Sequence, residues 1–168
     1  MGANTSGAGD TQTVLDAFRR IVQALRESSR WSERYVGLSG AQLFVLQKLA
    51  EAPGVSINEL AARTHTHQSS VSTVVTRLEQ NGLVRRARAG HDGRSVTLSL
   101  SPRGKRAAEQ APDVPQERLI SAIEKLTSTR RRQLAAVLTE VAKDMNSMDH
   151  APVMFFEERS RARRRTRA

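Results

Sequence analysis

Apolar residues at helical spacing dominate the first part of the chain. Between Asp10 and Tyr35 they recur every three or four positions, which predicts one long amphipathic helix with charged residues on its outer face. The apolar positions are Val14, Leu15, Phe18, Ile21, Val22 and Leu25. Residues 1–9 are small and polar and show no periodic pattern, so we expect them to be disordered.

Two shorter helices follow, and each begins with a capping box. In this motif a Ser or Thr accepts a hydrogen bond from the backbone three residues later, and a Glu or Gln at that later position bonds back to the cap. Ser39 with Gln42, and Ser56 with Glu59, have this spacing. They predict helices over 40–51 and 57–64, with the turn at Pro53 ending the first.

A fourth helix is predicted after a three-residue connection at 65–67. Gly82 ends it, at a position where a left-handed backbone is needed. Its apolar stripe is Val71, Val74, Val75 and Leu78. Its opposite face has mostly short polar side chains, namely Gln68, Ser69, Ser72, Thr73, Thr76, Arg77 and Gln80. A short helix, a tight connection and a second helix with one apolar face form a helix-turn-helix, whose second helix lies in the major groove of DNA.

A basic hairpin is predicted next. Leu83 and Val84 begin one strand, and residues 95–100 alternate strictly between apolar and polar. The connecting segment RRARAGHDGR contains glycine and is rich in arginine. We expect Arg94, at its tip, to enter the narrow minor groove, and Arg77 to contact phosphate.

Two more helices complete the predicted fold. One begins at Pro102, runs to about Ala111 and resumes after Pro115, and a last helix is capped by Thr127. The last helix has three arginines at 130–132 near its positive end, where cations are mildly unfavourable. The fold class is therefore mainly α (α+β). A winged helix-turn-helix over 37–101 lies between a dimerisation helix at 10–36 and C-terminal dimerisation helices at 102–147, with a basic tail at 148–168.

Length and charge narrow the class of protein. The chain has 168 residues, 38% of them hydrophobic and no cysteine, which fits one soluble domain or two interlocked pieces. It shows neither a membrane span nor a secretory signal, so we expect a cytoplasmic location. The net charge of +10 is concentrated in 84–106 and 157–168, which suits a polyanionic partner. For the tail, a role in solubility is an equally good interpretation.

Enzyme chemistry has little support in the sequence. There is no glycine-rich phosphate loop, nucleophile elbow or metal-binding His/Glu helix. His91 beside Asp92 lacks a third catalytic group, and His65 with His67 is a weak metal site. We therefore expect no catalysis, no cofactor and no metal. A non-specific architectural nucleic-acid-binding protein, using the arginine tail, is the alternative to a sequence-specific regulator.

From about Leu38 to Leu138 the chain resembles the MarR family of transcriptional regulators. The resemblance rests on ELAARTHTHQSSVSTVVTRLEQNGLVRR, HDGRSVTLSLSPRG and LTSTRRRQL. It implies that Arg94 is the wing arginine, held by Asp92, and we expect Arg86 and Arg88 to support the wing. It also places His67 where a capping serine is common. The recognition-helix contacts that it implies are Gln68, Ser69, Ser70, Ser72 and Thr73.

The resemblance further implies a homodimer that binds double-stranded DNA as a repressor. The terminal helices have apolar faces that one small core cannot cover, and a two-fold dimer requires a pseudo-palindromic operator with half-sites about 10 base pairs apart. Family members commonly release DNA when a small, often anionic aromatic compound binds. Candidate contacts are Trp31, Tyr35 and Phe44, with Arg30 or Arg34 as counter-charge. We favour the interpretation that these aromatic residues belong to the core or the dimer interface.

Overall fold

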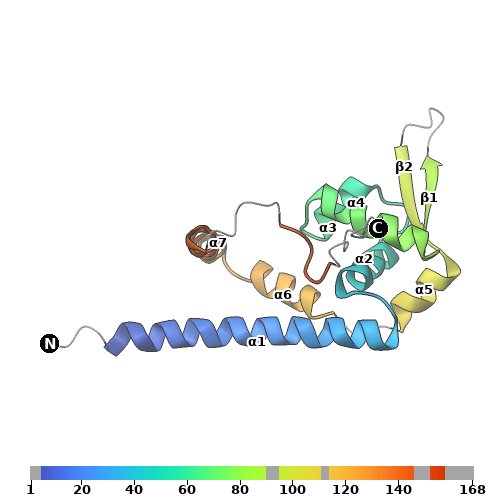
Figure 1. Ribbon diagram of the computed structural model, residues 1–168. Helices are drawn as coiled ribbons and strands as arrows, with labels where there is room; N and C mark the ends of the chain where they lie inside the picture. The colour runs from blue at the N-terminus through green and yellow to red at the C-terminus, as the bar shows by residue number, and fades with distance from the viewer. Residues whose placement is uncertain (1–4, 90–94, 111–113, 146–151, 158–168) are drawn as a thin grey trace, which may run out of the picture.

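A computed structural model describes residues 5–89, 95–110, 114–145 and 152–157. Helices α1 (Thr5–Tyr35), α2 (Gly40–Glu51), α3 (Ile57–Arg63) and α4 (Gln68–Gln80) precede a hairpin of β1 (Val84–Ala89) and β2 (Ser95–Leu100). Helices α5 (Pro102–Glu109), α6 (Pro115–Glu124) and α7 (Ser128–Asp144) follow. The hairpin extends from the same side of the body as α4, and α1 runs along the opposite side (Figure 1). The predicted fold class is confirmed.

Both capping boxes form as the sequence predicts. Ser39 Oγ accepts from the Gln42 backbone N–H at 3.3 Å, and the Ser39 N–H donates to Gln42 Oε1 at 2.9 Å. Ser56 and Glu59 make the same pair of bonds at 3.2 and 2.7 Å. These bonds satisfy backbone groups that a helix start leaves without partners. Helix α2 has its predicted bounds, and α3 ends at Arg63, one residue earlier than predicted.

Helix α1 begins earlier than the sequence predicts. Residues 5–9 are helical, so the expectation of disorder is wrong for them, while residues 1–4 lie outside the described residues. Extending an existing helix gains one hydrogen bond for each residue fixed, whereas starting a new one is costly. The Thr13 hydroxyl also donates to the Gly9 carbonyl at 2.9 Å. Small polar residues can therefore continue a helix that the apolar stripe has already stabilised.

The hydrophobic core lies within the winged helix. Helix α2 passes through its centre, and Phe44 is fully buried. The other large side chains with almost no exposed surface come from α2, α3, α4 and β2, and include Leu43, Leu46, Leu49, Leu60, Val71, Val75, Leu78 and Leu98. Burial of this apolar surface is the main force that fixes α4 against α2 and α3.

The base of the hairpin is tied to the body from two sides. Strands β1 and β2 are antiparallel, and Val55 forms a further bridge to Leu98 through bonds of 2.8 Å from Leu98 N to Val55 O and from Gly54 N to Leu98 O. On the other side, Ser101 caps α5 and donates to the Gly82 carbonyl at 2.7 Å. The positive φ of Gly82, 69°, confirms the predicted left-handed end of α4. The hairpin tip at 90–94 lies outside the described residues.

The terminal helices present apolar faces to solvent. Phe18 in α1 is 40% exposed and Val137 in α7 is 57% exposed. None of the residues of α7, all of which are described, is buried. The same faces include Val14, Leu15, Ile21, Val22, Leu134, Leu138, Val141 and Met145. Within the described ranges, none of the helices combines the length and the apolar character required to cross a bilayer.

The structure explains one of the arginines at the start of α7. Arg131 Nη2 donates to the carbonyls of Glu124 at 2.7 Å and Leu126 at 3.1 Å, at the end of α6. The carbonyl end of a helix carries partial negative charge, so this position is favourable for a cation. Arg131 therefore joins α6 to α7.

Candidate DNA interface

Helix α4 divides into a buried face and an exposed polar face. Its four apolar residues are at most 1% exposed, whereas Gln68, Ser69 and Thr73 are exposed. Ser72 and Arg77 are half-buried. The helical period of 3.6 residues produces this division, because residues three and four apart share a face. Five of the six recognition-helix residues singled out from the sequence therefore keep at least part of their surface accessible.

Ser70 is placed differently from those five. It is 8% exposed, and its hydroxyl donates to the Pro152 carbonyl at 3.4 Å. On the helix it lies beside the Val74 side of the stripe, so it turns toward the body rather than toward solvent. The structure thus separates Ser70 from the other recognition-helix contacts that the family resemblance implies.

The hydroxyls of the exposed face have a defined orientation. Thr73 Oγ1 donates to the Ser69 carbonyl at 3.1 Å, and Thr76 Oγ1 donates to the Ser72 carbonyl at 2.9 Å. A hydroxyl that donates to its own helix still has lone pairs to accept with. Thr73 is therefore suited to accept from the amino groups of adenine or cytosine, whereas Thr76 already accepts from Arg86 Nη2. The exposed amide of Gln68 can both donate and accept, which matches adenine in the major groove.

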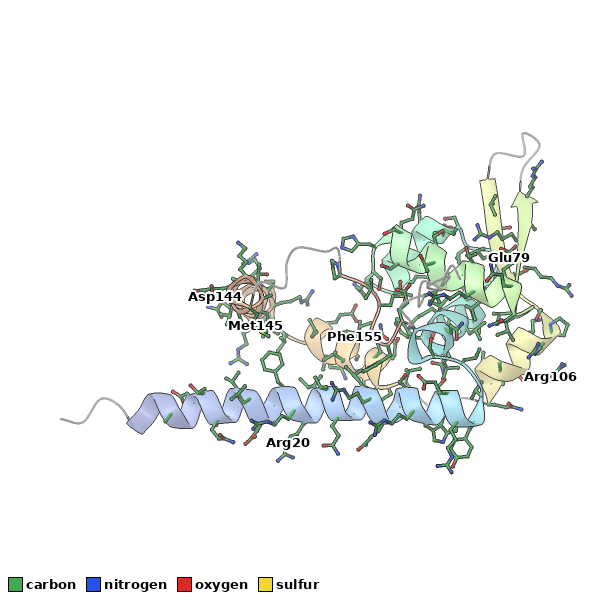
Figure 2. The ribbon with its side chains drawn as sticks, in the orientation of Figure 1. Arg20, Glu79, Arg106, Asp144, Met145 and Phe155 are labelled. Atoms are coloured by element: carbon green, nitrogen blue, oxygen red, sulfur yellow. The ribbon has the colours of Figure 1, made fainter. Side chains whose placement is uncertain are left out.

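Arg86 connects the hairpin to α4. Its Nε donates to Glu79 Oε2 at 2.9 Å and its Nη2 donates to Thr76 Oγ1 at 3.2 Å. Glu79 lies beside the base of the hairpin (Figure 2). The contact holds β1 at a set angle to the recognition helix, which suits the predicted supporting role of Arg86. Arg88 is exposed further along the same strand.

The other wing residues singled out from the sequence are not placed. Arg94 and Asp92 lie outside the described residues. Their predicted contact with the minor groove and their salt bridge remain predictions. The sequence had not indicated Glu79, because its contact with Arg86 spans the turn at Gly82 and follows no helical or strand period.

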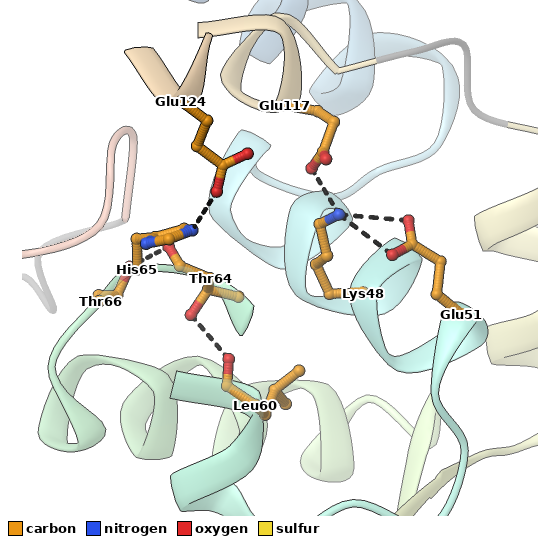
Figure 3. A network of polar contacts seen from close by, with 8 residues as sticks. All are labelled: Lys48, Glu51, Leu60, Thr64, His65, Thr66, Glu117 and Glu124. Carbon is orange, nitrogen blue, oxygen red and sulfur yellow. Dashed lines mark hydrogen bonds and ion pairs between the residues drawn. The ribbon is translucent and has the colours of Figure 1, made fainter. Parts of the chain in front are cut away.

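The connection between α3 and α4 makes a polar contact with α6. His65 has a positive φ of 50°, and its Nε2 lies 3.1 Å from Glu124 Oε1 (Figure 3). The Thr64 hydroxyl donates to the Leu60 carbonyl at 2.9 Å, which closes the end of α3. His67 occupies the cap position of α4 and makes no side-chain cap bond. The turn therefore relies on local bonds at the end of α3 and on the His65–Glu124 contact, and not on a capping side chain.

Lys48 makes a second connection between the winged helix and α6. Its Nζ lies 2.6 Å from Glu117 Oε2 and 3.1 Å from Glu51 Oε2, and the lysine side chain is 11% exposed (Figure 3). Desolvation by itself would lower the pKa of Lys48, but its bonds to Glu117 and Glu51 together outweigh it and raise the pKa above the ordinary value. The ammonium group therefore stays charged and links α2 to α6.

A cavity lies where α1, α5 and the end of α4 meet. It has a volume of about 430 Å³, and Tyr35, Arg103 and Arg106 contribute its aromatic ring and its cations. The remaining lining residues are Val36, Gly37, Leu38, Asn81, Leu83, Ala107 and Gln110.

Of the five candidate ligand contacts, counting both Arg30 and Arg34, all are described and Tyr35 alone lines this cavity. The Trp31 ring packs against the Tyr35 ring, and the two ring centroids are 5.2 Å apart. Phe44 lies in the core instead, and Arg30 is exposed outside the cavity. Arg103 and Arg106 line the cavity but were not singled out, because the sequence assigned them only to the general basic charge.

A recognition helix with a polar outer face, braced by a basic hairpin, defines a winged helix-turn-helix DNA-binding protein. Residues 36–95 match the model of the MarR family. The HTH-type transcriptional repressor Rv2887 of Mycobacterium tuberculosis is 28% identical over 138 residues, which are 82% of this chain and 99% of that protein. Residues 36–95 are thus similar to the MarR family, and the relatives that span most of the chain support a DNA-binding transcriptional regulator.

Solved structures share the fold. The regulator BldR from Sulfolobus solfataricus is 23% identical with a TM-score of 0.51, over 86% of this chain and 99% of that one. The S. aureus MepR–DNA complex is 19% identical with a TM-score of 0.51, over 77% of this chain and 95% of MepR. At these identities the likeness extends to the fold alone.

Proposed function

We propose that this protein is a repressor that binds a pseudo-palindromic operator as a homodimer. In this proposal α4 reads the major groove and the hairpin reaches the adjacent minor groove. The observation that carries it is the exposed polar face of α4, held beside the basic hairpin by Arg86. Both elements lie on the side of the molecule opposite α1 (Figure 1). The relative from M. tuberculosis is named a repressor, and MepR was crystallised with DNA.

The proposed dimer rests on the apolar faces of α1 and α7. In a single chain many large apolar side chains on these faces are exposed to solvent, and contact with a second copy would bury them. A two-fold axis then places two α4 helices on one side of the duplex. We therefore expect half-sites separated by about one helical turn, roughly 10 base pairs.

The cavity at Tyr35 supports a role for a small effector. Two guanidinium groups, from Arg103 and Arg106, beside an aromatic ring suit a small anionic aromatic compound. Asn81 and Leu83, which connect α4 to β1, also line the cavity. A compound bound there would touch the segment that sets the angle between recognition helix and wing. It would release DNA only if it bound the DNA-incompetent arrangement more tightly.

Operator binding is tested by selecting genomic fragments that the purified protein retains, then challenging the best fragment with excess random duplex. We expect one palindromic site to survive the challenge. Loss of that site would instead favour a non-specific architectural protein.

Gln68→Ala should reduce the free energy of operator binding by about 1–3 kcal/mol at one base position. Gln80→Ala, at the other end of the same face, is the matched control. An equal loss at every position would mean that Gln68 positions the helix and does not read a base.

A further inference from the structure

The chain returns to the winged helix after α7. Residues 152–157, which we call the strap, lie between α6 and the helices of the winged helix, with Phe155 labelled close to α6 (Figures 1 and 2). Met154 is 3% exposed and belongs to the same buried cluster as Val71 and Val75 of α4. Its neighbours Val153 and Phe155 are 57% and 50% exposed. The strap is therefore anchored by one methionine rather than by a continuous apolar face.

The strap also makes a polar contact with the first turn of α4. The Ser70 hydroxyl donates to the Pro152 carbonyl at 3.4 Å, across 82 positions of sequence. Within the strap, the Glu157 N–H donates to the Met154 carbonyl at 3.1 Å, and Phe156 has a φ of 57°. A left-handed backbone is uncommon for an aromatic residue and persists where the surroundings fix it. These features give the strap a defined shape against α4.

We propose that the strap positions the recognition helix, with Met154 and Ser70 as positioning residues for DNA reading. Gln68 and Ser69, which face solvent, directly precede Ser70. The contact between Ser70 and the strap therefore sets the position of the Gln68 and Ser69 side chains. The first turn of α4 otherwise starts at His67 without a side-chain cap bond, so the strap supplies support that the helix start lacks. The inference rests on the proposed operator binding for its effect on DNA, but the contact can be tested without DNA.

The first test measures hydrogen exchange of the full-length protein in the absence of DNA. The Val71 N–H bonds to the His67 carbonyl at 3.2 Å in the first turn of α4. Met154→Ala should raise exchange of the peptide covering 67–73 by about tenfold, because local opening follows lost packing. The peptide covering 14–22 should be unchanged, since that part of α1 lies outside the buried cluster that contains Met154. Met154→Leu should restore the wild-type rate, and Val153→Ala is the control at an exposed neighbour. Equal exchange in Met154→Ala and wild type would overturn the proposal.

The second test compares operator and random duplex at a temperature where every variant is folded. Met154→Ala should lower the ratio of operator to random affinity by about fivefold to a hundredfold, the range for one lost base contact, with the salt dependence unchanged. Removing residues 158–168 should instead lower the salt dependence and keep the ratio, because the strap remains. A Met154→Ala ratio equal to that of the wild type would refute the positioning role. A wild-type protein without operator preference would refute the proposed function and leave the exchange result standing.

Discussion

Phe18 offers the sharpest test of the proposed dimer. It lies on the apolar face of α1 and is 40% exposed in the single chain. An aromatic side chain can bury about 200 Å², so about 80 Å² of Phe18 remains to be covered by a partner. At about 25 cal/mol per Å², covering it contributes about 2 kcal/mol in each protomer and about 4 kcal/mol in a two-fold dimer. Phe18→Ser should therefore weaken dimerisation by up to a factor on the order of a thousand.

Sedimentation equilibrium over a wide concentration range measures this change directly. Arg20→Ser is the matched control, since it places the same residue two positions away on the side of α1 that faces away from α6 and α7 (Figure 2). The winged helix should stay folded in both variants, because Phe18 lies outside the buried cluster. If Phe18→Ser dimerises as tightly as Arg20→Ser, the apolar face of α1 does not form the dimer interface.

Three further changes test the body, the α6 contact and the wing. Gly104→Ala should destabilise the fold by about 1–3 kcal/mol in denaturant unfolding, because its Cβ would overlap the Leu83 carbonyl; unchanged stability would show that α5 can shift. Lys48→Met should cost about 1 kcal/mol near neutral pH. Because the folded pKa of Lys48 is raised, its contribution is complete from neutral pH up to the ordinary value of 10.5 and is lost as the pH rises through the folded value. A wild-type advantage that disappears between about pH 7 and the ordinary value of 10.5 would contradict this. Arg94→Ala should weaken operator binding and relax its dependence on A·T content beside the half-sites, and equal affinity would remove the wing from the mechanism.

Local signals explain why much of the fold could be predicted from the sequence. The capping residues Ser39, Ser56 and Thr127 each bond to a backbone group three residues away, so their effect is visible in a short stretch of sequence. Gly82 likewise ends α4 through its own backbone angle. The bounds of α2 and the end of α4 followed from such signals. The start of α1 did not, since helix extension depends on the helix that follows and not on the residues at 5–9 themselves.

The candidate site was only partly predictable from the sequence, because some of its contacts join residues that are far apart in the chain. The exposed face at Gln68, Ser69 and Thr73 follows from helical periodicity, and the structure keeps these side chains accessible. Ser70 was grouped with them by the family resemblance and not by helical periodicity. It is 8% exposed and bonds to the Pro152 carbonyl, and Pro152 comes from a segment whose sequence gives no sign of packing there.

By itself, therefore, the sequence determined the order of the helices, the hairpin, the polar face of α4 and the family resemblance. Each of these depends on interactions over a few residues or on a periodic pattern. Only the tertiary structure decided that Arg86 braces α4 through Glu79, that Lys48 links α2 to α6, and that the strap covers Ser70. These contacts join residues from different elements, and their partners are chosen by how the core packs, which no local pattern records.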